Sequence, residues 1–416
     1  STPPKDGMEI FTNTERLRKY RKMILELLLA DHCRDCTTCQ NNGTCKLQEL
    51  AMRFNIEGVR FPNGPDIPKK DESSLCITRD QKKCILCGDC VRMCNEIQNV
   101  GAIDFAHRGS KMTISTVFDI PIAESNCVGC GQCAAVCPTG AILLKNDTKF
   151  VWQALDDKEC RVSVQIAPAV RVALGQEFGL KDGENSMGRI VAALRRMGFN
   201  EIFDTSTGAD LTVLEESAEF LEYLNSGDRM MPLFTSCCPA WSMMAKTAFP
   251  ALAKNISMTM TPMVFTARMM KQADPEARMC FIGPCAAKKL EASRRTVRSD
   301  VDFVLTFEEL AGIIEGKDLD IDLLEVDENE AALCSASAAG RGFAQSGGVA
   351  NAVANKIKEW HPDMEVKIAS AQGLADCKKL LMLAKAGKYN GYLLEGMGCP
   401  GGCIGGAGTI ADPART

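Results

Sequence analysis

The sequence predicts a multidomain α+β protein in which two cysteine-rich segments precede a large α/β domain with mainly parallel sheets. The chain has 416 residues, enough for about three domains. Thirteen of its 22 cysteines lie before residue 150. Beyond that point, short apolar runs alternate with longer stretches of helical period, which is typical of strands and crossover helices. We therefore divide the chain into residues 1–72, 73–148 and 149–416.

Charge and hydropathy exclude several classes of partner. The net charge is -5 and no long run of one sign occurs, so neither a nucleic-acid surface nor an anionic membrane surface is indicated. No stretch approaches the roughly 18 to 20 apolar residues that a membrane span needs. The start, Ser1 to Lys5, has no secretory apolar region. We expect a cytoplasmic protein without membrane insertion and without a nucleic-acid partner.

The cysteine count points to metal-binding thiols. Twenty-two cysteines in 416 residues are about 5%, below the roughly 8 to 10% of disulfide scaffolds. Three histidines cannot supply many mixed Cys/His zinc sites. Soft sulfur ligands therefore favour iron-sulfur clusters held by reduced thiols.

Residues 1–72 combine a predicted helix with a short run of ligand candidates. Arg16 to Leu29 is basic and amphipathic, which predicts the helix. Three thiols and one imidazole follow within fourteen residues and could hold four corners of one 4Fe-4S cluster: His32, Cys36, Cys39 and Cys45. A zinc site on the same ligands is the alternative. Cys33 falls outside this spacing and is interpreted as a spare thiol.

Residues 73–148 contain an internal repeat of two four-cysteine runs, 43 residues apart. The spacing is that of a two-cluster ferredoxin, in which the fourth cysteine of each run binds the other cluster. The first predicted set is Cys84, Cys87, Cys90 and Cys137, and the second is Cys127, Cys130, Cys133 and Cys94. Paired zinc knuckles or thiols without metal are the alternatives. We expect a ferredoxin-like domain with two 4Fe-4S clusters.

Residues 149–416 have seven candidate strands: Val162–Ile166, Glu201–Phe203, Pro232–Phe234, Met279–Ile282, Phe303–Leu305, Val366–Ala369 and Tyr392–Leu394. Three thiol motifs follow strands of this set: Thr235–Trp241, Cys280–Lys289 and Leu393–Cys403. In each we expect a strand, a thiol-bearing turn and a helix, with Pro239 in the first helical turn. Ligands of parallel α/β sheets bind beyond the carboxyl ends of the strands. Four thiols can therefore converge on one site: Cys238, Cys285, Cys399 and Cys403.

With the accessory cysteines before them, these three motifs resemble an iron-iron hydrogenase over nearly the whole chain. The His/Cys run is also similar to the large iron-sulfur subunit of respiratory complex I. The resemblance implies an H-cluster, which is a 4Fe-4S cube linked to a two-iron unit with CO, cyanide and azadithiolate. Cys403 matches the cysteine that bridges cube and two-iron unit, and Cys237 matches the thiol that relays protons. The resemblance to this family further implies three accessory 4Fe-4S clusters, a ferredoxin or flavodoxin carrier, H-cluster maturation enzymes, and H2 and protons as substrates.

The resemblance also assigns roles around the cofactor. Glu216, Glu219 and Ser257 match the proton route, although surface carboxylates are the alternative reading for the two glutamates. Lys288 matches a lysine that donates to cyanide, with an exposed salt bridge as the alternative. Met397 matches a residue that packs beside the two-iron unit, with core packing as the alternative. Pro168 and Ala169 belong to a segment that contacts the cofactor.

Four positions depart from the family pattern close to this site. Ala169 stands where serine is common, Ala240 where glycine is usual, and Gly283 where methionine usually precedes Pro-Cys. Tyr223 replaces the arginine expected at the outer end of the proton route. We expect loss of a serine hydroxyl and of a methionine side chain to shift the redox balance of the cofactor, in a direction that the sequence does not assign.

The function expected is interconversion of 2H+ and 2e- with H2 by a ferredoxin-linked hydrogenase. One alternative is a sensory hydrogenase that reports H2 to a signalling partner. The other is an iron-sulfur assembly protein of the nuclear prelamin A recognition factor type, which lacks the two-iron unit. Six cysteines without an assigned ligand role are interpreted as structural thiols: Cys33, Cys76, Cys160, Cys280, Cys334 and Cys377.

Overall fold

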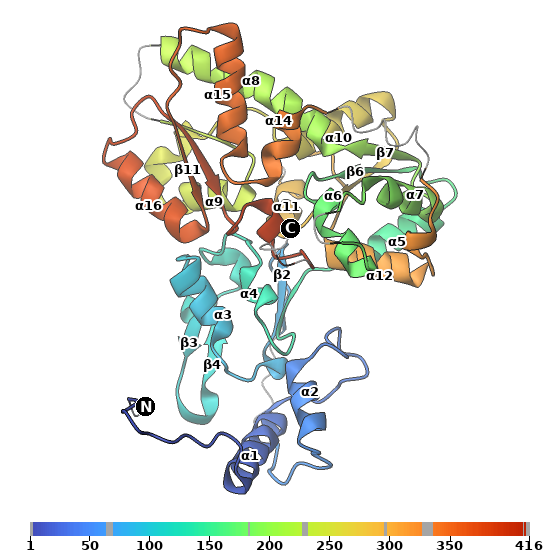
Figure 1. Cartoon of the computed structure of the whole chain (residues 1–416), viewed down its shortest axis with the longest axis vertical. Coiled ribbons are helices and arrows are strands. Elements are labelled where there is room, and N and C mark those ends of the chain that lie inside the picture. The colour runs from blue at the N-terminus through green and yellow to red at the C-terminus, as the bar shows by residue number, and fades with distance from the viewer. Residues whose placement is uncertain are drawn as a thin grey trace.

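Two parallel sheets organise residues 149–416 (Figure 1). The computed structural model describes residues 3–63, 70–181, 184–226, 232–294, 298–326, 336–410 and 412. The first sheet has the order β10-β9-β6-β7, with β6 at Val162–Ile166, β7 at Glu201–Asp204, β9 at Arg278–Ile282 and β10 at Phe303–Leu305. The second has the order β11-β12-β8, with β8 at Leu233–Phe234, β11 at Ile368–Gln372 and β12 at Leu393–Met397. Every pairing in both sheets is parallel, as the alternation of strand and helix patterns predicts.

All seven expected strands are present with small shifts of their ends, and two of them continue three residues beyond the predicted carboxyl end. β11 begins at Ile368 rather than Val366 and ends at Gln372, and β12 continues to Met397. The extension includes Gly396, which has low strand propensity. Its missing side chain is required here, because a Cβ at Gly396 would lie 2.2 Å from the Trp241 ring. Packing against that buried ring thus explains why the strand passes through a glycine.

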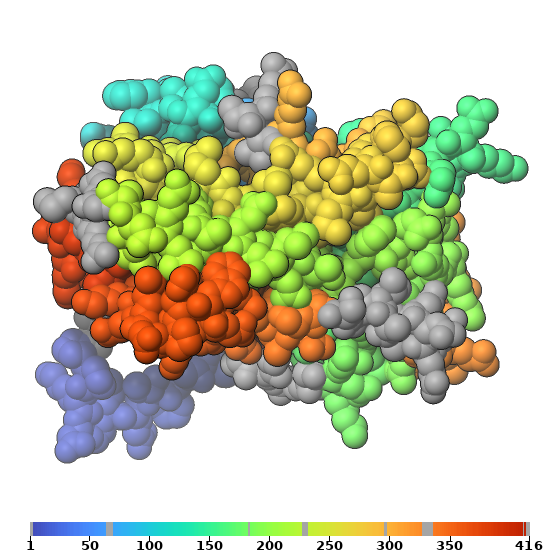
Figure 2. Space-filling model, turned by 90° about the horizontal axis from the view of Figure 1, so that it is seen from above, coloured from blue at the N-terminus to red at the C-terminus, as the bar shows by residue number. Residues whose placement is uncertain are grey.

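Helices cover both sheets. Their bounds are α5 Thr148–Asp156, α6 Val170–Ala173, α7 Met187–Met197, α8 Thr205–Asn225, α9 Pro239–Ala248, α10 Pro262–Ala273, α11 Ala287–Ala292, α12 Phe307–Gly316, α14 Ala338–Arg341, α15 Gly348–Trp360 and α16 Leu374–Lys385. α8 lies between α15 and α10 on the face shown in Figure 2. α9 begins with Pro239 in its first turn, as predicted, where the missing N–H costs no helical hydrogen bond.

Residues 70–147 contain two small antiparallel sheets and two short helices, and the two helices are related by the cysteine repeat. One sheet has the order β1-β2-β5 and the other pairs β3 with β4. The bounds are β1 Lys70–Asp71, β2 Ile77–Asp80, α3 Asp89–Arg92, β3 Asp104–Ala106, β4 Thr113–Ser115, α4 Gln132–Ala135 and β5 Ile142–Leu144. α3 and α4 each follow a glycine with positive φ, Gly88 at 77° and Gly131 at 75°.

The N-terminal residues form two helices at the far end of the molecule from the parallel sheets (Figure 1). α1 spans Glu15–Asp31 and α2 spans Lys46–Arg53, so the predicted helix is present and slightly longer than expected. Thr14 caps α1 by accepting the Leu17 N–H at 3.3 Å. In the described ranges, no helix is both long and apolar enough to cross a membrane.

Candidate active site

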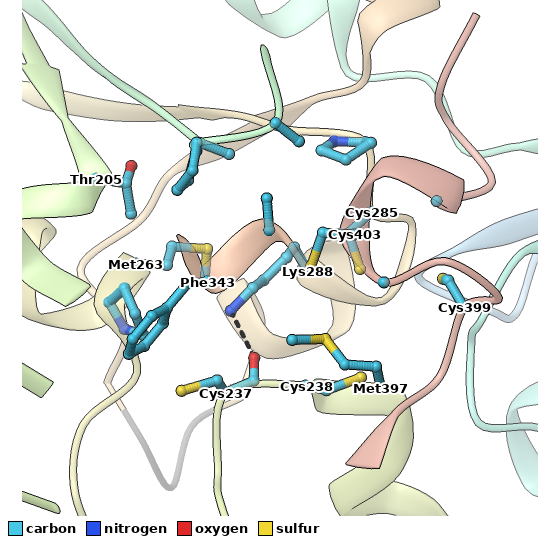
Figure 3. Close-up of a pocket in the computed structure, with 18 of the residues that line it drawn as sticks. Thr205, Cys237, Cys238, Met263, Cys285, Lys288, Phe343, Met397, Cys399 and Cys403 are labelled. Carbon is cyan, nitrogen blue, oxygen red and sulfur yellow. Dashed lines mark hydrogen bonds between the residues drawn. The ribbon is translucent and has the colours of Figure 1, made fainter. Parts of the chain in front are cut away.

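A cavity lies at the carboxyl ends of β8, β9 and β12, and five thiols line it (Figure 3). The five are Cys237, Cys238, Cys285, Cys399 and Cys403. Cys237 and Cys238 follow β8, Cys285 follows β9, and the other two follow β12. The structure therefore brings together all three thiol motifs at the carboxyl ends of parallel strands, as expected, although β8 and β12 belong to one sheet and β9 to the other.

The third motif differs from the strand, turn and helix arrangement that the sequence predicts. After Cys403 the chain forms only a 3₁₀ turn, Cys403–Gly405. Close backbone contacts explain this difference. A Cβ at Gly406 would lie 2.3 Å from the Pro284 carbonyl oxygen, and a Cβ at Gly402, where φ is 86°, would lie 2.6 Å from the Ala344 carbonyl oxygen. The loop is thus clamped between two other backbone segments, which leaves no room for a helix.

The thiols suit a multi-atom cluster better than a single ion. Burial raises the pKa of Cys285 to about 11, and it also raises the pKa of Cys238, although the Trp241 and Gly398 N–H groups oppose the shift. Buried thiols of this kind become thiolates when a metal replaces the proton. In the described part of the chain, no three His, Cys, Asp or Glu side chains approach closely enough to hold one ion. The four sulfurs instead surround a space, as the donor set of a 4Fe-4S cube requires.

Cys237 lies at the cavity wall, and its side chain points away from that of Cys238 (Figure 3). Burial raises its pKa, and the nearby Glu216 carboxyl contributes in the same direction. Glu216 is fully buried on α8, so the alternative reading of a surface carboxylate is wrong for this residue. Burial raises the Glu216 pKa to about 8, with the charge of Glu219 as the second cause. A neutral carboxyl can therefore persist beside the thiol near neutral pH.

Glu219 and Ser257 are brought into direct contact one helical turn further along α8. The Ser257 hydroxyl donates to Glu219 Oε2 over 2.5 Å, and the Met258 N–H donates to Glu219 Oε1 over 2.9 Å. Glu219 is half-buried, so it is neither an exposed surface carboxylate, as in the alternative interpretation, nor fully enclosed. Tyr223 lies a further turn along and stacks on Phe220 at 5.8 Å between ring centroids. The three predicted proton-route residues thus lie in one row from the cavity outward.

Lys288 enters the cavity from α11, but its side chain is only 12% exposed and is paired. Its Nζ donates to the Cys237 carbonyl oxygen at 3.3 Å and to Glu291 Oε2 at 2.7 Å. Burial alone would lower its pKa, but the Glu291 carboxylate outweighs this effect and the pKa is raised. A salt bridge is therefore present, although not the exposed one of the alternative reading. Sequence reasoning missed Glu291, whose spacing of three residues from Lys288 on a helix was the available signal.

Apolar side chains complete the wall of the cavity. Met397 is 4% exposed and packs with Phe343 and Val349, so core packing and cavity lining both describe it. Pro168 and Ala169 also line the cavity. Sequence reasoning assigned no role to several further lining residues, among them Phe281 of the second thiol motif and Thr205, Met263 and Phe343 from other segments.

Two of the positions that depart from the family pattern have a structural explanation. A Cβ at Gly283 would lie 2.6 Å from the ring of Phe281, which itself lines the cavity. The ring thus occupies the space that a larger side chain at residue 283 would need. Ala240 packs its methyl group against Gly398, where a Cβ would lie 3.0 Å away.

Glu395 is a second buried carboxyl that sequence reasoning missed. It accepts the N–H groups of Gly347 at 2.9 Å and Ala350 at 2.8 Å, which stabilises the start of α15. Burial raises its pKa to about 7. A charged residue inside the buried strand Leu393–Met397 was the signal in the sequence.

The cysteines of the repeat surround two separate cavities. Cys84, Cys87, Cys90 and Cys137 line one of them. Cys94, Cys127, Cys130 and Cys133 line the other. The fourth cysteine of each run therefore joins the other run, which is the arrangement that binds two 4Fe-4S clusters.

The N-terminal ligand candidates lie beside the junction of α1 and α2. His32, Cys36 and Cys45 line one cavity, and Cys39 lies close enough to raise the pKa of Cys36, which burial and the Cys45 thiol also raise. His32 Nε2 is buried and has no hydrogen-bond partner among the described residues, whereas Nδ1 accepts the Arg34 N–H at 3.0 Å. A metal at Nε2 requires the other tautomer, in which Nδ1 carries the proton.

The cysteines without an assigned ligand role differ in burial. Cys76, Cys280 and Cys377 are at most 1% exposed, as expected of structural thiols. Cys33 is exposed and Cys160 half-buried. Cys334 lies outside the described residues.

Comparison with known proteins identifies the class of protein that this fold and site define. Residues 160–407, more than half of the chain, match the family model "iron only hydrogenase large subunit, C-terminal domain". The chain therefore belongs to the iron-only (FeFe) hydrogenase family, whose catalytic subunits are oxidoreductases. Residues 21–60 match the "NADH-ubiquinone oxidoreductase-G iron-sulfur binding region", and residues 83–141 match a 4Fe-4S dicluster domain.

Relatives are similar over almost the whole chain. Identity to the NADP-reducing hydrogenase subunit HndD of Solidesulfovibrio fructosivorans is 35%, covering 98% of this chain and 77% of the relative. Identity to iron hydrogenase 1 of Clostridium pasteurianum is 30%, covering 97% and 77%. A solved variant of FeFe-hydrogenase HydA1 from Chlamydomonas reinhardtii is 26% identical with a TM-score of 0.52, covering 64% of this chain and 85% of that one.

Proposed function

We propose that this protein catalyses the reversible reaction of two protons and two electrons to H2 at an H-cluster held in the five-thiol cavity. One observation carries the proposal: a fifth thiol, Cys237, lines the same cavity as the four thiols of the cube and lies near the buried carboxyl of Glu216. Four thiols are enough to hold a cube. A fifth beside a carboxyl of raised pKa adds a group that can transfer protons.

The protein's own side chains hold the cofactor and move the proton. Cys238, Cys285, Cys399 and Cys403 would bind the cube, with Cys403 shared with the two-iron unit, and Lys288, Met397, Pro168 and Ala169 would enclose that unit. When bound, the H-cluster supplies the redox-active iron at which H2 is formed or split. Cys237 exchanges a proton with Glu216, and Ser257 and Glu219 continue the route outward.

Electrons would reach the cube through three accessory 4Fe-4S clusters. Two would bind in the cavities of the cysteine repeat, and the third on His32, Cys36, Cys39 and Cys45. We propose ferredoxin or flavodoxin as the carrier and the cytoplasm as the location. Because the relative HndD is named as a subunit of an NADP-reducing hydrogenase, a nicotinamide-linked partner subunit is the alternative source of electrons. Steady-state assays with reduced ferredoxin and with NADPH distinguish the two.

A sensory role is the second candidate, because Ala169 and Gly283 change the cavity wall. A cluster-assembly role without the two-iron unit is less well supported, since Cys237, Glu216 and Lys288 would then have no reaction to serve. Turnover measured with H2 and a dye in excess separates catalyst from sensor: a catalyst sustains many turnovers, whereas a sensor does not.

An infrared spectrum tests the proposal directly. The protein is produced with H-cluster maturation enzymes, purified without oxygen, and examined for the stretching bands of metal-bound CO and cyanide. We expect both sets of bands, together with H2 production. The proposed function would be contradicted if these bands are absent from protein that has all of its 4Fe-4S clusters. A known hydrogenase matured in the same way must show the bands as a control.

A further inference from the structure

The second cysteine run of the repeat, which begins at Cys127, packs directly against the elements that surround the five-thiol cavity. We call the cluster site on Cys94, Cys127, Cys130 and Cys133 the inner cluster. Val128 packs in the core built around Phe234 and Trp241, and Cys130 packs against that core. In the other direction, Ala286 packs in the core of the repeat with Ile77. Loop 127–133 and the turn after Cys285 therefore interlock, which gives them a fixed relative position.

Gly131 makes the closest approach across this boundary. A Cβ at Gly131 would lie 2.7 Å from the Ala286 Cβ and 2.9 Å from the Ala407 Cβ, and its φ is 75°. Ala286 directly follows Cys285, and Ala407 lies four residues after Cys403. A larger residue at 131 would push the loop that carries Cys130 and Cys133 away from the loops that carry the cube.

Gln132 holds the two loops together with a hydrogen bond. Its side-chain Nε2 donates to the Gly405 carbonyl oxygen over 3.0 Å, and the side chain is 8% exposed. Gly405 ends the short 3₁₀ turn that starts at Cys403. Through the close approach of Gly131 to Ala286, which follows Cys285, the same loop also reaches the second thiol motif. The loop thus approaches ligand candidates of both later motifs.

We propose that Gln132 is a positioning residue for electron transfer between the inner cluster of the repeat and the cube of the H-cluster. This inference rests on the proposed function. In each event one electron leaves the inner cluster on Cys94, Cys127, Cys130 and Cys133 and arrives on the cube, and no bond forms or breaks. The hydrogen bond to Gly405 keeps this transfer distance short, and Gly131 permits the contact.

The first test measures the magnetic coupling of the two clusters, without H2 chemistry. Full-length protein made without maturation enzymes is reconstituted with iron and sulfide and fully reduced. Paramagnetic resonance then reports the spin interaction of the inner cluster with the cube. We expect a clear interaction in the native sequence and a weaker one in Gln132→Leu, which keeps a similar volume but cannot donate. The same interaction in both proteins would overturn the inference, whether or not the two-iron unit is ever found.

The second test separates electron relay from chemistry at the site. Isotope exchange between H2 and heavy water needs no external electrons, whereas viologen-linked H2 oxidation needs the relay. In matured Gln132→Leu we expect the viologen-linked rate to fall about tenfold while exchange changes less than about twofold, because a small displacement strongly weakens a positioned transfer. An equal fall of both rates would overturn the inference, since it would indicate damage to the active site.

Lys378→Met is the matched control. Lys378 of α16 also crosses the boundary, donating to the Asn99 carbonyl oxygen over 3.1 Å, but this partner belongs neither to loop 127–133 nor to the loops that carry the cube thiols. We expect both rates and the spin interaction to remain unchanged in this variant. If Lys378→Met lowers the viologen-linked rate as much as Gln132→Leu does, any weakened contact at this boundary has the same effect. The specific positioning role of Gln132 would then be wrong.

Discussion

Lys288 donates a hydrogen bond to the backbone carbonyl of Cys237 over 3.3 Å and therefore fixes the main chain that carries the thiol. The next residue, Lys289, points away from the cavity and binds Glu309 and Asp147 at 3.1 Å each. Two successive lysines of α11 thus connect the backbone of Cys237 with Asp147, the residue directly before α5. Substitution of Lys288 would therefore affect the Cys237 backbone directly, whereas substitution of Lys289 would affect the buried contacts to Glu309 and Asp147.

Replacement of Cys237 with alanine should nearly abolish turnover while the cofactor stays bound. The four thiols proposed for the cube are unchanged, so the infrared bands should persist, whereas the first proton acceptor is lost. Loss of a positioned acid or base typically costs about 10²- to 10⁴-fold in rate. H2 production and the infrared spectrum are measured on the same sample. Cys33→Ala, an exposed thiol outside the cavity, serves as the control, and wild-type turnover in Cys237→Ala would remove the assigned role.

Glu216→Gln should lower turnover and also change the pH dependence of stability. The folded pKa of about 8 exceeds the ordinary value of 4.5, so ionisation of this buried carboxyl opposes folding as pH rises through this range. Glutamine has no such cost. The stability advantage of the variant should therefore grow by up to about 1.4 kcal/mol per pH unit between about pH 5 and 8 and then level off.

Thermal unfolding of the protein without clusters, followed at several pH values, measures this difference. Glu215→Gln changes the neighbouring carboxyl of α8, which is exposed, and should show no pH-dependent advantage. A constant difference between Glu216→Gln and wild type across this range would show that the Glu216 carboxyl is not protonated in the fold.

Local spacing predicted much of this site, and long-range contacts account for the rest. The grouping of the cysteines around two cavities follows from runs of eleven residues. The place of each thiol motif at the carboxyl end of a parallel strand follows from the alternation of strand and helix patterns, whereas the packing that brings the two sheets together does not. Glu395 and Gln132 could not be assigned in the same way. Their partners, Gly347 and Gly405, lie 48 and 273 residues away, so only the packed fold brings them together. The extension of β12 through Gly396 likewise depends on a distant ring, Trp241.

Lys289→Met should destabilise the fold much more than it changes the chemistry. The lysine side chain is 3% exposed, and its loss leaves the buried carboxyl of Glu309 without its counter-charge. Such a change typically costs about 3 to 5 kcal/mol. Chemical denaturation, compared with Lys379→Met at an exposed pair on α16, measures the difference. A loss below about 1 kcal/mol, equal to that of the exposed pair, would mean that the buried network does not stabilise the junction.

Gly283→Met should be tolerated only when Phe281 is reduced in size. The two residues lie on the same side of β9 as it ends, and a Cβ at residue 283 would meet the Phe281 ring at 2.6 Å. In the native background we expect overpacking to cost about 1 to 3 kcal/mol. Phe281→Ala leaves a cavity and should cost about 3 to 5 kcal/mol. The double variant should lose less than the sum of the two, because the methionine then fills the vacated space.

Four proteins complete this cycle, with thermal unfolding as the readout of packing and the CO and cyanide bands as the readout of the cofactor environment. Gly312→Met is the control, because a Cβ at Gly312 meets no atom within 4 Å. Strictly additive losses would show that Phe281 does not occupy the space beside Gly283. If the losses are not additive, the aromatic ring and the glycine act as one unit of the cavity wall. The bands of the double variant would then differ from wild type, because a thioether replaces an aromatic ring in the cavity wall.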